Sequence, residues 1–402
     1  MEPKLADNKD KGVDSRGRSQ RILITGGGTG GHVYPGLAVA EALLKLDPGL
    51  EIRFAGTRHG LESVLVPRAG YRFHRVPASG VRGLGHVARV RFVVNFVVGT
   101  LRSLGLMLTW RPAVVLGTGG YVSAPVMAAA RLLGVPCAIQ EQNAVPGSAN
   151  RLVGRWARRV YLGFSGAAEF FRSGAAVETG NPVRASFADA ASAPGDRPES
   201  ETRDLCKRVL IFGGSRGART LNRAAGEAAE EWRDRADLAL RIQTGPADHA
   251  ALVTAFGTAA EGRVHIVPYI EDMAEALHWA DLVVCRAGAM TLAELQVAGR
   301  PALLVPFPHA TDDHQLRNAE GLADLGAARV LEDNVCDGKT LVALVDDLLA
   351  DGEALAGMAA AARTAGRPRA ALVIAADLLH LAGHPAGRPA RTEQKKAAPS
   401  VS

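Results

Sequence analysis

The feature that most constrains this chain is a strand–glycine loop–helix pattern that occurs twice. An apolar, β-rich run over residues 21–25 is followed by the glycine-rich loop 26–31 and then by apolar residues at helical spacing. The same order returns at residues 209–212, with the loop 213–217 and a helical stretch from residue 218. Such openings are typical of parallel α/β units. The repeat therefore predicts two similar α/β domains.

Each half continues with short apolar runs separated by helical segments, which indicates parallel sheets with crossover helices. The expected strands are 52–55, 113–116, 137–140 and 159–162 in the first half, and 240–243, 264–267, 282–285 and 302–305 in the second. Ligands of such folds bind beyond the carboxyl ends of the strands. Two facing domains would therefore hold one ligand in the cleft between them.

Composition shifts divide the chain into six parts. Pro, Gly and Ser mark an interdomain linker, and charge with Pro, Ala and Ser marks two disordered tails. The expected parts are a tail at 1–20, an N-terminal domain at 21–186, the linker at 187–206, a C-terminal domain at 207–362, a helical segment at 363–383 that packs back on the N-terminal domain, and a tail at 384–402.

The charge of the chain is strongly asymmetric. Residues 21–184 hold 19 Lys and Arg against 7 Asp and Glu, a net charge of +12, whereas residues 185–383 hold 19 against 29, a net charge of −10. A basic domain indicates an anionic partner. Nucleic acid is not expected, because basic and aromatic residues do not interleave. The first 20 residues have no apolar core, so no secretory signal is predicted and the chain is expected to stay in the cytoplasm.

An apolar stretch, Phe92–Leu108, is 17 residues long and is interrupted by Asn95, Arg102 and Ser103. A membrane span needs about 20 apolar residues, so the stretch predicts a helix with one apolar face. That face could enter the headgroup region of an anionic membrane. The alternative is a helix buried in the domain. The membrane patch would consist of Leu84, Val87, Val90, Phe92, Val93 and Phe96.

Several loops carry groups suited to a phosphorylated ligand. Backbone N–H groups of both glycine loops can approach phosphates, although a tight turn explains a single loop equally well. His32, at the end of the first loop, is a candidate general base, because imidazole titrates near neutral pH. Thr291 and Glu294 fit the spacing of a helix capping box. Alternatively, the Glu294 carboxylate accepts hydrogen bonds from two vicinal hydroxyls, as on a ribose.

Some chemistries have no motif in this chain. It lacks H-E-x-x-H, paired Cys and His ligands, a D-x-D run and G-x-S-x-G. No metal and no cofactor are therefore expected. The four cysteines are widely separated, which argues against a disulfide framework or a structural zinc site.

Read together, several strings resemble the MurG family of UDP-N-acetylglucosamine:undecaprenyl-pyrophosphoryl-MurNAc-pentapeptide N-acetylglucosaminyltransferases. They are GGGTGGHVYPGLAVA, VVLGTGGYVSAP, EQNAVPGSANR, GNPVR, GGSRGART, VVCRAGAMTLAEL and PFPHATDDHQLRNA, in order over residues 21–381. The resemblance implies a GT-B fold of two Rossmann-like domains. It also implies inverting transfer of GlcNAc from UDP-GlcNAc to the C4 hydroxyl of lipid I, giving lipid II.

The resemblance also implies site residues. His32 would be the base or a partner of the acceptor pyrophosphate. The UDP-GlcNAc site would comprise Thr29, Gly30, Gly31, Asn143, Arg184, Ser215, Ile270, Ala289, Met290, Thr291, Leu292, Ala293, Glu294 and Gln315. The implied location is peripheral, on the cytoplasmic face of the inner membrane, with other cell-wall enzymes as candidate partners.

Three alternatives share this fold or ligand. Another GT-B transferase would use a different lipid acceptor, and a UDP-GlcNAc 2-epimerase would convert the donor without any acceptor. A non-catalytic protein would bind the UDP-sugar without turnover. His32 together with both glycine loops argues against the last of these.

Overall fold

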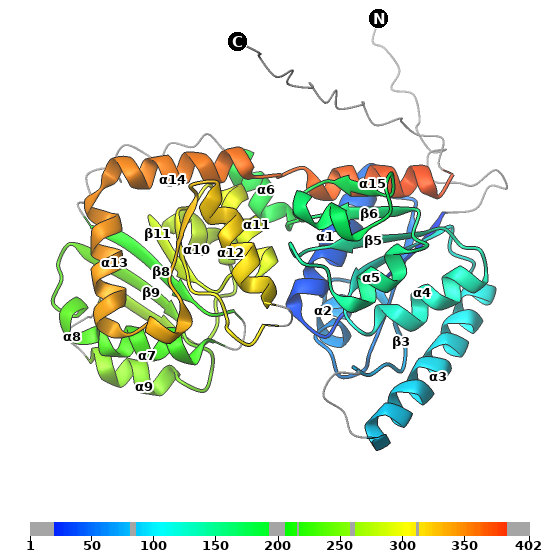
Figure 1. Cartoon of the computed structure of the whole chain (residues 1–402), viewed down its shortest axis with the longest axis horizontal. Coiled ribbons are helices and arrows are strands. Elements are labelled where there is room, and N and C mark those ends of the chain that lie inside the picture. Colours follow the sequence, from blue (N-terminus) through cyan, green and yellow to red (C-terminus); the bar gives the residue numbers. More distant parts are fainter. Residues whose placement is uncertain are drawn as a thin grey trace, which may run out of the picture.

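The computed structural model describes residues 20–80, 86–192, 206–214, 217–257, 262–310 and 313–383. Over these residues the chain forms two α/β lobes that lie side by side (Figure 1). Both sheets contain only parallel pairs, in the orders β3-β2-β1-β4-β5-β6-β7 and β10-β9-β8-β11-β12-β13. The two-domain parallel α/β fold expected from the glycine loops is therefore confirmed. Both tails, most of the linker, Leu84 and Ser215 lie outside the described residues.

The N-terminal lobe runs from the first glycine loop to β7. Its elements are β1 (Arg21–Gly26), α1 (Gly30–Leu46), β2 (Glu51–Gly56), α2 (Glu62–Arg68), β3 (Arg72–Arg75), α3 (His86–Trp110), β4 (Val114–Gly119), α4 (Ser123–Leu132), β5 (Cys137–Glu141), α5 (Ser148–Gly154), β6 (Arg159–Leu162), η1 (Ser165–Phe170) and β7 (Ala176–Glu178).

The C-terminal lobe repeats the pattern from β8. Its elements are α6 (Ala185–Ser192), β8 (Lys207–Phe212), α7 (Arg219–Glu227), α8 (Ala229–Trp232), β9 (Leu238–Gln243), α9 (His249–Phe256), β10 (Val264–Val267), α10 (Met273–Trp279), β11 (Leu282–Cys285), α11 (Ala289–Ala298), β12 (Ala302–Leu304), α12 (His314–Asp324), β13 (Ala328–Val330), η4 (Asp333–Val335), α13 (Gly338–Ala350) and α14 (Gly352–Ala365). The last helix is α15 (Ala370–Leu381).

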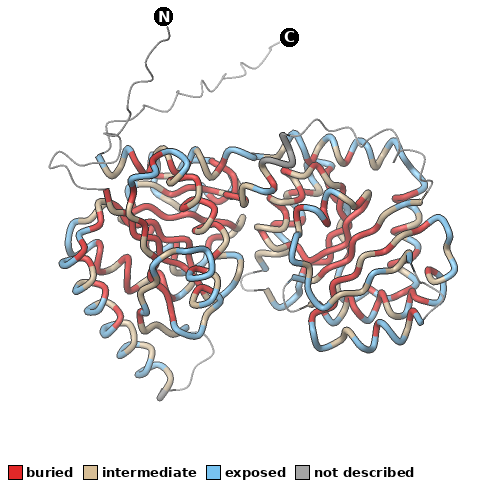
Figure 2. The backbone as a smooth tube through the Cα atoms, turned by 180° about the vertical axis from the view of Figure 1, so that it is seen from behind, coloured by how far each residue is buried: buried red, intermediate tan, exposed pale blue. Residues whose placement is uncertain are grey.

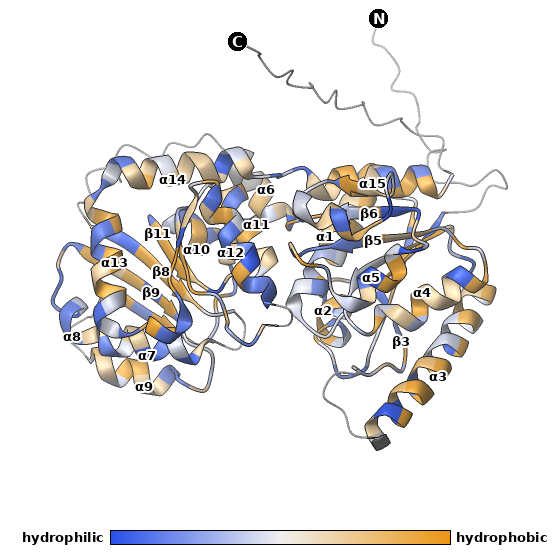
Figure 3. Ribbon diagram, in the orientation of Figure 1, coloured by the Kyte–Doolittle hydropathy of each residue, from blue (hydrophilic) through white to orange (hydrophobic). Residues whose placement is uncertain are grey.

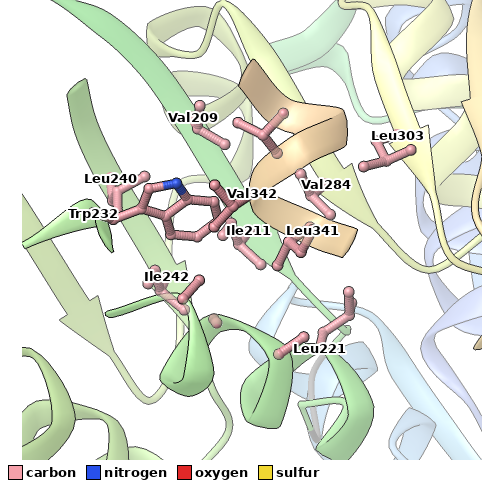
Figure 4. Packing of buried hydrophobic residues seen from close by; sticks show 14 of the residues in the cluster. Val209, Ile211, Leu221, Trp232, Leu240, Ile242, Val284, Leu303, Leu341 and Val342 are labelled. Carbon is pink, nitrogen blue, oxygen red and sulfur yellow. The ribbon is translucent and has the colours of Figure 1, made fainter. Parts of the chain in front are cut away.

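The eight strands expected from apolar runs are all present, but β3, β7 and β13 were not predicted. They are short edge or near-edge strands with polar or exposed residues, so they lack the apolar run that marks a buried strand. The central strands are buried on both faces, as the red strands of Figure 2 show. Figure 4 shows the core of the C-terminal lobe, where the side chains of Trp232, of helix α13 and of the neighbouring strands pack around Ile211.

The chain crosses into the C-terminal lobe earlier than the expected linker. Val183 and Phe187 already pack in the core of the C-terminal lobe, so the first part of the expected linker is structured as α6. After α14 the chain returns, and Ile374 and Leu378 of α15 join the core of the N-terminal lobe beside α1 (Figure 1). Asp377 of α15 accepts hydrogen bonds from the hydroxyl of Tyr161, at 2.8 Å, and from Arg159.

Helix α3 is longer than the sequence suggested. It spans 25 residues, and its part Ala88–Trp110 is long and apolar enough to cross a membrane by length and composition alone. The expectation that the stretch is too short to span a membrane is therefore wrong, because the helix extends beyond both ends of residues 92–108. One such helix is weak evidence for a span, and α3 packs on α4 through its buried Ser103, Met107 and Trp110.

Candidate active site

His32 lies in the first turn of α1, where the carboxyl ends of β1, β4 and β5 converge. Its Nδ1 is 3.0 Å from the carbonyl oxygen of Thr118 and 3.2 Å from Oε1 of Gln142. The Thr118 hydroxyl donates to the backbone carbonyl of His32 at 2.6 Å. Burial lowers the pKa of His32, against the opposing effects of Glu141 and of these hydrogen bonds. The imidazole is therefore neutral at pH 7, as a general base requires.

The first glycine loop is only partly open to a ligand. The N–H of Gly28 donates to Glu62 Oε2 at 2.9 Å, and the Glu62 carboxylate also accepts from the N–H and hydroxyl of Thr57. A Cβ at Gly27 would lie 2.2 Å from Cδ of Glu62. The loop 26–28 is thus glycine-rich because it folds over a protein carboxylate. In this loop the amides of Thr29, Gly30 and Gly31, at the N-cap and in the first turn of α1, therefore remain the candidates for binding a phosphate.

Arg184 and Glu294 form an ion pair at the boundary between the lobes. The distance between Arg184 Nη2 and Glu294 Oε1 is 3.6 Å, and the Glu294 side chain is 12% exposed. Burial raises the pKa of Glu294 to about 7, and Arg184 only partly offsets this effect. The Arg184 guanidinium also lies over the rings of Tyr34 and Phe187, each at 5.0 Å. A buried carboxylate with a raised pKa and a cationic partner at 3.6 Å is typical of ligand sites.

The capping alternative for Glu294 is wrong. Helix α11 begins at Ala289 after the N-cap Gly288, and no side chain caps it. Glu294 is the sixth helical residue, too far along to reach the amide of the N-cap. The T-x-x-E spacing suggests that Thr291 is the N-cap residue. The helix begins earlier, because Gly288, three residues before Thr291, is the N-cap residue in an extended conformation.

The N-terminus of α11 leaves three backbone donors unpaired within the helix, those of Ala289, Met290 and Thr291. The N–H of Leu292 donates to the carbonyl of Gly288 at 3.0 Å. The side chains of Leu292 and Ala293 are buried in the core of the C-terminal lobe. These two residues therefore fix the position of the helix, and the amides before them face the lobe boundary.

Asparagine side chains join the two lobes. Asn318 of α12 accepts the N–H of Ala144 at 2.9 Å and donates to Oδ1 of Asn143 at 3.3 Å. Both the N–H and the Nδ2 of Asn143 donate to the buried carboxylate of Glu141. Asn181 donates to the carbonyl of Ala289 at 3.4 Å. Asn143, predicted as part of the UDP-GlcNAc site, therefore lies beside the C-terminal lobe.

Two further predicted residues border the same region from the C-terminal lobe. Gln315 lies in the first turn of α12, and its Oε1 accepts the N–H of Phe307 at 3.0 Å, which leaves Nε2 directed elsewhere. Ile270 follows β10 and is partly buried against the core.

The predicted site did not include Gln142, Asn181 and Asn318, although each lies within one of the quoted strings. Gln142 directly follows β5 and precedes Asn143, whereas Asn181 and Asn318 each lie three positions from a predicted residue, Arg184 and Gln315. Within the described parts of the chain, no group of three or more His, Cys, Asp or Glu residues could hold a metal ion.

Comparison with known proteins gives two matching family models. The glycosyltransferase family 28 N-terminal domain matches residues 22–162, and the glycosyltransferase family 28 C-terminal domain matches residues 208–374. The two models together follow the two lobes.

Relatives match over nearly the full chain. The UDP-N-acetylglucosamine–N-acetylmuramyl-(pentapeptide) pyrophosphoryl-undecaprenol N-acetylglucosamine transferase of Geobacter metallireducens is 40% identical over 89% of this chain and 98% of its own length. The transferase of the same description from Syntrophotalea carbinolica is 42% identical over 86% and 94%.

Among solved structures, Acinetobacter baumannii MurG is 31% identical, with a TM-score of 0.72 over 90% of this chain and 99% of that one. UDP-GlcNAc 2-epimerase from Neisseria meningitidis has a TM-score of 0.63 over 90% and 100%, but is only 13% identical. That likeness shows the fold alone.

Proposed function

Because this chain belongs to the family of UDP-N-acetylglucosamine–N-acetylmuramyl-(pentapeptide) pyrophosphoryl-undecaprenol N-acetylglucosamine transferases, we propose that it transfers GlcNAc from UDP-GlcNAc to lipid I. The product is lipid II, formed with inversion at the sugar C1. The observation that best supports this reaction is that Arg184 lies over the ring of Tyr34, two residues after His32 in α1, and pairs with Glu294 at the lobe boundary. A candidate base and a candidate nucleotide site thus adjoin each other.

The donor is held by the C-terminal lobe. The Glu294 carboxylate accepts hydrogen bonds from the two ribose hydroxyls, and Ile270 supports the uracil. Gln315 and Asn143 contact the hydroxyls of GlcNAc. The diphosphate gains negative charge as it leaves, and the amides of Ala289 to Thr291, the Ser215 loop and Arg184 stabilise it. Preorganised donors and a helix N-terminus are the groups that such a charge requires.

The acceptor approaches from the N-terminal lobe. The C4 oxygen of MurNAc attacks C1 of GlcNAc, and His32 Nε2 takes its proton. The new C1–O bond forms as the bond from C1 to the UDP oxygen breaks. The amides of Thr29, Gly30 and Gly31 lie at a helix start, where phosphate oxygens bind, and complete the UDP-GlcNAc site from the N-terminal lobe.

A turnover assay with UDP-GlcNAc labelled in the sugar and a lipid I analogue tests this function. We expect label in a lipid-linked disaccharide and release of one UDP per transfer. Three results would contradict the proposal: conversion of the donor without an acceptor, transfer to diacylglycerol but not to lipid I, or donor binding with no turnover. Each of them corresponds to one of the alternatives that share this fold or ligand.

Membrane association belongs to the same proposal. Helix α3 exposes an apolar row, Val90, Val94, Val97, Leu101 and Leu108, with exposed fractions between 50% and 64%. Figure 3 shows this helix as mostly apolar along its length, at the edge of the N-terminal lobe. Phe92 and Phe96 of the expected patch stack on each other and are only partly exposed. The row therefore carries the apolar contact, and we place the enzyme peripherally on the cytoplasmic face of the inner membrane.

The pair Val94→Asp and Leu101→Asp is expected to weaken vesicle binding at least tenfold, because it puts two carboxylates into the apolar row. Sedimentation with phosphatidylcholine vesicles, with and without phosphatidylglycerol, measures this at low and high salt. Wild-type binding should favour anionic vesicles and weaken with salt, since each Lys or Arg near the surface contributes about 1 kcal/mol. Val253→Asp, at an exposed position of α9 in the other lobe, is the control. Equal binding of the double variant and the control would contradict the role of α3.

A further inference from the structure

A chain of three buried amide side chains leads from His32 to the lobe boundary. Gln140, Gln142 and Asn181 are exposed by 0%, 2% and 4%. Gln142 Nε2 donates to the Thr118 carbonyl at 2.7 Å and to Gln140 Oε1. Gln140 Nε2 then donates to Asn181 Oδ1 at 2.8 Å. Asn181 Nδ2 donates to the carbonyl of Gln142 at 2.9 Å and, more weakly at 3.4 Å, to that of Ala289.

The direction of this chain is fixed by its end groups. Backbone carbonyls of Thr118, Gln142 and Ala289 can only accept, so the amide nitrogen of each partner must face them. Turning any one amide around would put oxygen against oxygen at a carbonyl or carboxamide partner. The two oxygens cannot form a hydrogen bond, so a buried polar group would lose its partner. The orientation of Gln142 therefore depends on Gln140 and Asn181, although neither of these touches His32.

The same logic applies to the imidazole. Nδ1 of His32 faces two acceptors, the Thr118 carbonyl and Gln142 Oε1. Nδ1 must carry the proton, and in the neutral ring Nε2 is then the free lone pair.

We infer that Gln142, Gln140 and Asn181 are positioning residues that hold His32 with Nδ1 protonated and Nε2 available to accept the proton of the attacking hydroxyl. The inference rests on the proposed function only where it makes Nε2 the acceptor of the proton of the attacking hydroxyl. The tautomer itself is a property of the free protein. Other charged or titratable groups acting on His32 are Glu141 and His314, and neither supplies the contact to Nδ1.

The first test is the tautomer. Imidazole 15N spectra of the histidine-labelled free enzyme, with His32 assigned by comparison with His32→Ala, report which nitrogen is protonated. We expect neutral His32 to be protonated at Nδ1. A signal from protonated Nε2 in the neutral ring overturns the inference. Because no acceptor is needed, failure of the lipid I assay leaves this result standing, and the two failures are distinguishable.

The second test uses opposite substitutions at one position. The hydrogen bond that Gln142 Oε1 accepts from His32 raises the pKa of His32, so Gln142→Leu should move the acidic limb of the kcat–pH profile to lower pH. Gln142→Glu places a carboxylate beside Nδ1 and should move that limb to higher pH. Both variants should reduce kcat at least tenfold at pH 7. Shifts in the same direction, or no shift in either variant, contradict the inference.

The third test acts at a distance. Gln140→Leu should displace the 15N signals of His32 and lower kcat about tenfold with little change in donor KM, because it releases Gln142 without touching His32. Asn222→Leu is the matched control, since Asn222 is a buried amide of the other lobe with hydrogen bonds to Thr244 and Asp248. Asn222→Leu should lower the free energy of unfolding by a similar amount and leave the 15N signals of His32 unchanged. Unmoved His32 signals in folded Gln140→Leu would show that the chain is only structural.

Discussion

Replacing His32 with alanine is expected to lower kcat by about 10²–10⁴-fold, the usual contribution of a general base. The imidazole is neutral, and its Nδ1 is occupied by two acceptors. No other side chain assigned to the site offers an unprotonated basic nitrogen, because amide nitrogens are not basic and Arg184 is always charged. Donor affinity should change little, because the proposed contacts to UDP-GlcNAc come mainly from the C-terminal lobe. Steady-state kinetics with a lipid I analogue, together with calorimetric titration of UDP-GlcNAc, measures both quantities.

His249→Ala is the control for loss of a histidine. His249 is half-buried on α9, and its Nε2 lies 3.2 Å from the carbonyl of Ile266. Its loss should leave kcat within about twofold of the wild type. A decrease of less than tenfold in a folded His32→Ala enzyme would mean that His32 only supports the loops around it.

Replacing Glu294 with glutamine is expected to raise the Kd for UDP-GlcNAc about 100-fold. Hydrogen bonds to a charged acceptor contribute about 1.5–3 kcal/mol each, and an amide replaces one of the two carboxylate oxygens with a donor. Glu353→Gln, at an exposed position of α14, should leave donor affinity unchanged. Wild-type affinity in Glu294→Gln would exclude the ribose role.

The same variant is expected to be more stable than the wild type at alkaline pH. The pKa of Glu294 is about 7 in the folded enzyme, against 4.5 for an ordinary Glu. Between these values the folded state binds more protons than the unfolded state, so the wild type loses stability as pH rises through 7. The total is about 3 kcal/mol. Denaturant unfolding of the free enzyme should show this difference at pH 8 and little difference at pH 4.

Donor binding should show the complementary pH dependence. The wild-type Kd for UDP-GlcNAc should rise by up to about tenfold for each pH unit below 7, because protonation removes the charged acceptor. Glu294→Gln should lack this dependence. A helix cap at Glu294 would give the opposite stability result, since its loss costs about 1 kcal/mol.

The glycine loops and apolar runs in the sequence were enough to predict the two parallel α/β lobes, and the quoted motifs were enough to predict the family. These signals are short in range: a strand, its loop and the next helix lie within some 25 residues, and backbone hydrogen bonding with burial of apolar faces specifies them locally. β3, β7 and β13 were missed because these edge strands are short and lack an apolar run, whereas the edge strand β10 has one and was predicted. His32 and Glu294 were candidates from their own positions in the sequence, and motif resemblance added Arg184.

The sequence did not show which other groups those residues contact in the folded protein. Gln142 stands 110 positions from His32, Asn318 stands 174 from Ala144, and the chain returns from the second lobe so that Asp377 binds Tyr161. Such contacts depend on where two sheets place their carboxyl ends, and no local pattern encodes that. Tertiary structure alone therefore decided that Glu62 fills part of the first glycine loop and that Glu294 faces Arg184 instead of capping its helix. It also oriented the amides toward His32, because a buried donor or acceptor must find its partner wherever the fold brings one.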